Sequence, residues 1–109
     1  MSQNIRRELL KGDAYRMFLV ELFSHIEETR RFLSLPKHQV KSEDLLELRI
    51  KFHSIKGAAG FFGFDSIARL AAKLEKDFLQ QDNVTLERQQ LLESIDRLHR
   101  ERENLPAPG

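Results

Sequence analysis

The chain lacks cysteine and tryptophan, and only three of its 109 residues are prolines. The absence of cysteine excludes disulfides, thiol catalysis and cysteine-based zinc sites. Charged residues make up 32% of the chain and interrupt every apolar run, so no segment is expected to span a membrane. Lysine and arginine number 18 against 17 for aspartate and glutamate, and this balance argues against nucleic acid as the main partner.

The chain does contain enough apolar sequence for one small folded domain. Hydrophobic residues account for 40% of it, too high a share for a disordered segment, and the length leaves room for one domain only. No apolar stretch follows residues 1–4, so we expect no signal peptide and a cytoplasmic location.

Apolar residues recur at intervals of three and four, and no stretch alternates as a half-buried strand would, so we predict an all-α protein. The first long helix is predicted to run from a cap at Asp13 to about Leu35, where Pro36 ends it. A cap at Ser42 begins the second helix. The residues expected to face the core on these helices are Tyr15, Leu19, Leu22, Ile26, Thr29 and Leu33, then Leu45, Leu48, Phe52, Ile55, Ala59 and Phe62.

Two more helices are predicted after a pair of glycines. Gly60 and Gly63 are expected to break the second helix, and Asp65 to cap the third. A polar turn over residues 80–83 separates the third helix from a fourth, which Thr85 opens. The core-facing residues expected on them are Ile67, Leu70, Ala71, Leu74 and Phe78, then Leu91, Leu92, Ile95 and Leu98.

Four such helices with short connections predict an antiparallel, up-down four-helix bundle. We expect the bundle to cover residues 13–104. An N-terminal segment, residues 1–12, is expected to hold a short extra helix over residues 3–10, and residues 105–109 to form a tail or linker. The same spacing also fits a coiled-coil oligomer, but helices of moderate length separated by helix breakers favour a closed, monomeric bundle.

One segment stands out in composition. Three of the five glycines and four of the eight phenylalanines fall within residues 52–64, around His53. Glycine inside a helix costs about 1 kcal/mol relative to alanine, so Gly57 in the second helix needs a reason. The phenylalanines are interpreted as core and loop packing, and His25, His38 and His99 as ordinary surface or core residues.

Helical spacing places Arg49, His53, Lys56, Gly57 and Gly60 on one face, away from the predicted core. A neutral imidazole is a competent nucleophile for phosphoryl groups near physiological pH. A lysine one turn away would stabilise the arriving phosphoryl oxygens, and the glycines would give a partner's active site close access. Each residue alone is commonly a plain surface residue, but the combination favours phosphoryl chemistry at His53.

This pattern resembles the signature of histidine phosphotransfer (HPt) domains. It is especially similar to the N-terminal phosphotransfer domain of chemotaxis-type histidine kinases. The signature is a histidine, then lysine and glycine after two residues, then small residues and further glycines. Here it runs His53-Ser54-Ile55-Lys56-Gly57-Ala58-Ala59-Gly60-Phe61-Phe62-Gly63-Phe64.

The resemblance implies a four-helix bundle that carries a phosphoryl group on Nε2 of one exposed histidine. The donor would be a kinase's ATP-binding domain or a receiver aspartate, and the acceptor a receiver aspartate of a response regulator. By matched position, His53 is the phosphoacceptor, Lys56 the neighbouring cation and Gly57 the clearance residue. Because the partners would supply ATP, Mg²⁺ and the aspartate, we expect no cofactor or metal in this chain and no enzyme activity of its own.

In the chemotaxis-type domains a glutamate on the following helix holds the imidazole through its other nitrogen, and the matching residue here is Glu75. The pattern alone also points to this residue, because Glu75 shares a helix face with Ala68, Ala72 and Leu79. Accepting the Nδ1–H would fix the tautomer and leave Nε2 free, and this role is predicted for Glu75, with a solvated surface glutamate as the alternative. Those domains place a second histidine where Ala72 stands, so the surrounding hydrogen bonds are expected to differ.

Alternative functions differ in what surrounds His53. A dimerising kinase helix would place an acidic residue directly after it, where Ser54 stands, and no Gly-Lys-Ser/Thr forms a P-loop. The histidines show no metal-ligand spacing. The main alternative is a non-phosphorylated helical docking module for a receiver domain or signalling assembly. In either case the expected binding face holds Arg49, Gly57 and Gly60, rimmed by apolar residues of the first and second helices.

Overall fold

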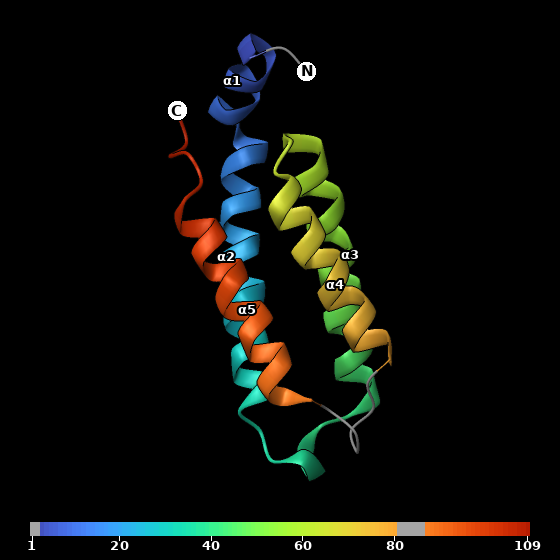
Figure 1. Cartoon of the computed structure of the whole chain (residues 1–109). Helices are drawn as coiled ribbons and strands as arrows, with labels where there is room; N and C mark the ends of the chain where they lie inside the picture. The colour runs from blue at the N-terminus through green and yellow to red at the C-terminus, as the bar shows by residue number, and fades with distance from the viewer. Residues whose placement is uncertain (1–2, 81–86) are drawn as a thin grey trace.

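The computed structural model describes residues 3–80 and 87–109, and the regular structure of this part of the chain is helical (Figure 1). Four long helices run in alternating directions: α2 (Asp13–Leu33), α3 (Ser42–Phe62), α4 (Asp65–Gln80) and α5 (Arg88–Glu103). A short helix, α1 (Gln3–Lys11), precedes α2, and a 3-10 turn, η1 (Lys37–Gln39), lies between α2 and α3. The predicted all-α bundle with a short leading helix is confirmed.

The bundle is elongated, with extents of 49 × 21 × 19 Å. Around it, α3 neighbours α2 and α4, and α5 closes the ring between α4 and α2. None of the described helices is long and apolar enough to cross a bilayer.

The predicted starts of the first three long helices are each one residue late. Asp13 and Ser42 are the first helical residues, while Gly12 and Lys41 occupy the caps, without a side-chain cap hydrogen bond. The reason is that the carbonyl of the preceding residue accepts the first helical bond, as Phe64 does from the amide of Ala68 before α4. Asp65 therefore begins α4 and does not cap it.

The predicted helix ends also needed correction. α2 ends at Leu33, two residues before Leu35, because Ser34 closes the helix with its amide directed at the carbonyls of the last turn. Gly60 remains helical, and the break comes at Gly63 alone. Gly63 has a φ of 80°, a left-handed conformation that glycine adopts without strain.

The start of the fourth helix was predicted at Thr85, after a polar turn over residues 80–83. Gln80 is the last residue of α4, whereas residues 81–86, which include Thr85, lie outside the described residues. The described helix, α5, begins later than predicted, at Arg88, because Glu87 before it is not helical. Residues 105–109 are not helical. This segment lies against the α1–α2 junction, where the Tyr15 hydroxyl donates to the Pro106 carbonyl over 2.5 Å.

The core contains nearly all of the residues predicted for it. The exceptions are Leu19 and Leu92, which are half-buried, whereas Phe18 and Ser94 are buried beside them. One aromatic cluster fills the end of the bundle near the α3–α4 turn; its members are Tyr15, Phe18, Phe62 and Phe64, with ring centroids 5.4–6.4 Å apart. A second aromatic contact, Phe52 on Phe78, joins the middle of α3 to α4, with stacked rings 5.8 Å apart.

Candidate functional site

His53 lies in the middle of α3 and points out of the bundle. Its side chain is 66% exposed, whereas the neighbouring Phe52 and Ile55 are buried. This arrangement follows from the helical period, because the buried stripe of α3 occupies the opposite side of the helix. The predicted outward orientation of His53 is therefore found in the structure.

The α3–α4 hairpin brings Glu75 opposite His53. The chain reverses at Gly63 and Phe64, and His53 and Glu75 each lie eleven residues from Phe64. In two antiparallel helices, equal distances from the turn place two residues at the same level. The stacked rings of Phe52, which directly precedes His53, and Phe78, three residues after Glu75, hold the two helices together near that level.

The carboxylate of Glu75 joins two residues of α3. Its Oε1 lies 2.9 Å from Nδ1 of His53, and its Oε2 lies 3.1 Å from Nζ of Lys56. Burial acts to raise the pKa of Glu75, but the hydrogen bonds from His53 and Lys56 and the positive charge of the lysine outweigh it, so the pKa lies below its usual value. Glu75 is therefore ionised at neutral pH and serves as an acceptor in both contacts.

An ionised carboxylate can only accept, so the hydrogen in the short contact belongs to Nδ1 of His53. In the neutral ring this leaves Nε2 with a free lone pair. Nε2 makes no hydrogen bond with any residue in the described ranges, and the ring is exposed. The arrangement is suited to nucleophilic attack by Nε2 on an electrophile brought by another molecule.

Lys56 is the residue expected from the sequence to stabilise arriving phosphoryl oxygens. In this structure, which holds no phosphoryl group, its amino group is paired with Glu75. The lysine side chain is 39% exposed, and its amino group lies one helical turn from the imidazole. Sequence spacing gave the correct face but could not show which anion the amino group contacts.

Arg49, Gly57 and Gly60 lie on the same side of α3 as His53. Arg49 is half-buried, one turn before the histidine, and forms no ion pair with a described residue. A β-carbon added at Gly57 or Gly60 would meet no atom within 4 Å. The glycines are thus not required by packing inside the bundle, and the space above them is open to a partner.

Exposed apolar residues surround His53. Leu46, Ile50 and Phe61 follow the outer face of α3, with 47%, 56% and 57% of their surfaces exposed, and Leu79 adds 59% from α4. The interpretation of the phenylalanine cluster as packing holds for Phe52, Phe62 and Phe64. Phe61 fits it only in part, because its ring contacts Phe62 edge-on at 5.2 Å but remains 57% exposed. The sequence analysis placed Leu79 on the face of Glu75 but did not predict that it would be exposed beside His53.

Comparison with known families places this geometry in context. Residues 13–105 match the Hpt domain family. Searches of curated proteins and of solved structures gave no significant match. The match covers most of the chain, including all four long helices and the His53 site, and on this basis the chain belongs to the Hpt domain family.

Proposed function

We propose that this protein is a phosphorelay intermediate in which Nε2 of His53 carries the phosphoryl group. The observation that supports the proposal is the contact between Nδ1 of His53 and the ionised Glu75, with Nε2 free and exposed. We propose a kinase's ATP-binding domain or a receiver aspartate as donor and a response-regulator aspartate as acceptor. The protein would act as a monomeric, cytoplasmic substrate of these domains.

In the uptake step, the Nε2 lone pair forms a bond to phosphorus while the bond from phosphorus to the donor oxygen breaks. The positive charge that develops on the imidazole is stabilised through Nδ1–H by the carboxylate of Glu75. In the delivery step, a receiver carboxylate oxygen attacks phosphorus and the P–N bond breaks. The electron pair returns to Nε2, so His53 is regenerated unchanged.

Lys56 is proposed to stabilise the transferred group. Its side chain is 39% exposed, so a side-chain rotation could redirect its amino group from the Glu75 carboxylate to phosphoryl oxygens on Nε2. Phosphoryl oxygens carry more negative charge than one carboxylate, which favours that exchange. Glu75 would then be left as the partner of the imidazole alone.

The docking face proposed for both partners consists of the exposed apolar residues near His53, which are Leu46, Ile50, Phe61 and Leu79. An interface core of apolar side chains around a reactive atom excludes water from the transfer step. Gly57 and Gly60 provide the low point of this face, where the aspartate-bearing loop of a receiver would reach Nε2.

The narrower assignment to the chemotaxis type is also a proposal. The glycine- and phenylalanine-rich run after His53 and the position of Glu75 support it, whereas Ala72 departs from it. Direct phosphorylation of His53 by the isolated ATP-binding domain of a chemotaxis-type kinase, without any receiver, would support it. Phosphorylation by receivers alone would contradict it.

The function is tested by reconstituting the relay. A labelled phosphoryl group on one receiver domain is followed to a second receiver in the presence of the wild type, His53→Gln or His38→Gln. His38 is exposed on η1 and provides a matched control. We expect transfer with the wild type and with His38→Gln and none with His53→Gln. Equal transfer with His53→Gln would refute the proposal and favour the docking module.

A further inference from the structure

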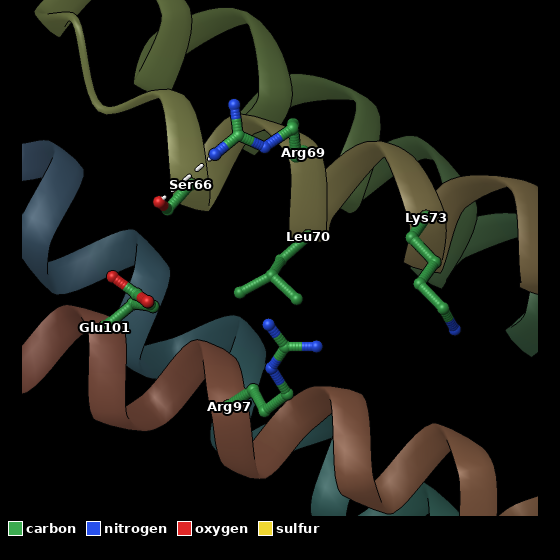
Figure 2. Close-up of a pocket in the computed structure, with 6 residues that line it drawn as sticks. All are labelled: Ser66, Arg69, Leu70, Lys73, Arg97 and Glu101. Carbon is green, nitrogen blue, oxygen red and sulfur yellow. Dashed lines mark hydrogen bonds between the residues drawn. The ribbon is translucent and has the colours of Figure 1, made fainter.

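A groove between α4 and α5 holds cationic side chains that the phosphotransfer proposal does not use. One hollow in it has a volume of about 220 Å³ and is lined by Ser66, Arg69, Leu70, Lys73, Arg97 and Glu101 (Figure 2). A neighbouring hollow of about 380 Å³ shares Lys73 and Arg97 and continues toward Gln90. The two hollows therefore form one elongated groove along the helix pair.

Two of the cationic side chains in the groove, Arg97 and Arg69, have N–H donors that no described residue accepts. Arg97 reaches from α5 toward Leu70 of α4 and forms no ion pair or hydrogen bond with any residue that the structure describes (Figure 2). Arg69 makes a single long contact, 3.5 Å to the Ser66 hydroxyl. Lys73 differs, because Asp77 and Ser94 hold its amino group at 2.8 and 3.3 Å. A guanidinium carries five N–H donors suited to oxyanions, so the groove offers unmet donors to a carboxylate.

The acidic residues of the groove restrict the length of an anionic ligand. Glu101 lines one hollow and Glu93 the other, so a continuous polyanion such as a nucleic acid would meet a carboxylate at each end. The chain's net charge of +1 also gives such a polymer little attraction. A short acidic segment can contact the arginines without reaching Glu93 and Glu101, and Leu70 supplies an apolar floor for one of its side chains.

The groove and His53 lie on opposite flanks of α4. Lys73 and Glu75 are two residues apart, which in a helix of 3.6 residues per turn is a rotation of about 200°. Glu75 contacts His53 of α3, whereas Lys73 contacts Ser94 of α5. An occupant of the groove would therefore leave Nε2 of His53 accessible.

We propose that the α4–α5 groove is a second binding site, which holds a short acidic peptide segment of a partner protein through Arg97 and Arg69. The site would keep a partner attached while His53 meets a different domain. The inference goes beyond the proposed phosphotransfer function, since it depends only on the groove and holds whether or not His53 is phosphorylated.

The test is fluorescence anisotropy with the full chain at low salt. The probe is a short fluorescein-labelled peptide with aspartates and glutamates around one leucine, compared with its asparagine and glutamine counterpart. Arg97→Gln is expected to weaken binding of the acidic peptide by about fivefold, because one charge-assisted contact is lost. Arg31→Gln, which removes an exposed arginine from α2, serves as the matched control and is expected to leave binding unchanged.

Amide chemical shifts provide the location of binding. The proposal would be supported by saturable shifts that the acidic peptide causes only in residues 66–73 and 90–101, together with no shifts from the asparagine and glutamine peptide. Any of three results would overturn it: no saturable binding, equal weakening by Arg97→Gln and Arg31→Gln, or tighter binding of an oligothymidine or of inorganic phosphate than of the acidic peptide.

Discussion

Oε1 of Glu75, on α4, lies 2.9 Å from Nδ1 of His53, on α3, and this contact joins the two helices at the candidate site. The contact depends on the sharp α3–α4 turn at Gly63, which places both residues at one level, and on the stacked Phe52 and Phe78 beside them. A side chain that is exposed and otherwise free to rotate is thereby given one orientation and one tautomer. The predictions below concern this site and the framework that supports it.

Replacing Glu75 is expected to slow phosphoryl uptake by His53. Glu75→Ala removes the acceptor for Nδ1–H, and a loss of about tenfold or more in the single-turnover rate is expected. Glu75→Gln keeps an amide oxygen in reach and should retain more of the rate than Glu75→Ala. The nitrogen chemical shifts of the imidazole are expected to report one tautomer in the wild type and a mixture in Glu75→Ala. Unchanged shifts and an unchanged rate would remove Glu75 from the mechanism.

Replacing Lys56 tests the second contact of the same carboxylate. Lys56→Met removes the cation that is proposed to move onto the phosphoryl oxygens, and about a tenfold slower transfer is expected because the site is partly exposed. Lys76→Met, an exposed lysine of α4, is the matched control and should transfer at the wild-type rate. If both variants slow transfer equally, the effect is one of overall charge and Lys56 has no specific role.

Gly57 is expected to show opposite effects on stability and function. Because an added β-carbon meets no atom within 4 Å, Gly57→Ala should stabilise the helix by about 0.5–1 kcal/mol. The same methyl group should hinder the approach of a receiver, and a larger side chain such as leucine should hinder it further. Thermal unfolding and transfer rates measured on the same samples check both effects. A variant that is less stable, or as fast as the wild type with leucine, would contradict the role in clearance.

Two phenylalanines separate packing from docking. Phe52→Ala empties a buried site in the α3–α4 contact and is expected to lower the free energy of unfolding by about 3–5 kcal/mol. Phe61 is 57% exposed, so Phe61→Ala should cost less than about 1 kcal/mol but weaken the binding of a receiver. Chemical denaturation and titration calorimetry distinguish the two. Unweakened receiver binding in Phe61→Ala would exclude this ring from the interface.

The ion pair between Lys51 and Glu28 links α3 to α2 and gives a dependence on pH. The hydrogen bond from Lys51, the largest cause, keeps the pKa of Glu28 below its usual value of 4.5 in the folded protein. The contribution to stability is therefore present above pH 4.5 and lost as the pH falls through the folded pKa.

Glu28→Gln should accordingly lower the free energy of unfolding at neutral pH by less than about 1 kcal/mol, with the difference vanishing in acid. Glu47→Gln, an exposed glutamate of α3, is the control and should show no such pH dependence. A difference for Glu28→Gln that persists unchanged in acid would mean that its charge is not the cause.

The fold was predictable from the sequence because the buried positions of an amphipathic helix recur every three or four residues, and the apolar residues of this chain follow that spacing. The starts of the first three long helices were each misplaced by one residue, since the first helical hydrogen bond is accepted by a backbone carbonyl, such as that of Gly12, whatever the side chain. Phe18 was overlooked because two adjacent apolar residues, Phe18 and Leu19, compete for the same stripe and only packing decides between them.

The candidate site was predictable in its residues and less so in its contacts. The spacing of His53 and Lys56 indicates a shared helix face. His53 and Glu75 are equally far from Phe64 in the sequence, so the helical hairpin that turns there brings the two residues to the same level. The pairing of Lys56 with Glu75 depends on side-chain rotation, which spacing does not determine. The unpaired state of Arg97 likewise depends on side-chain rotation, because Glu93 and Glu101 lie four residues to either side of it on α5 and the spacing alone would favour ion pairs.

The most direct test of the phosphotransfer proposal is the intact mass of the protein after incubation with a phosphorylated receiver domain or an active histidine-kinase catalytic domain. Wild type and His53→Gln are measured side by side, each before and after mild acid. We predict that the wild type alone gains one phosphoryl group, and that acid removes it, as expected for a phosphoramidate. A phosphoryl group on His53→Gln, or an acid-stable one on the wild type, would contradict the assignment of His53 as the phosphoacceptor.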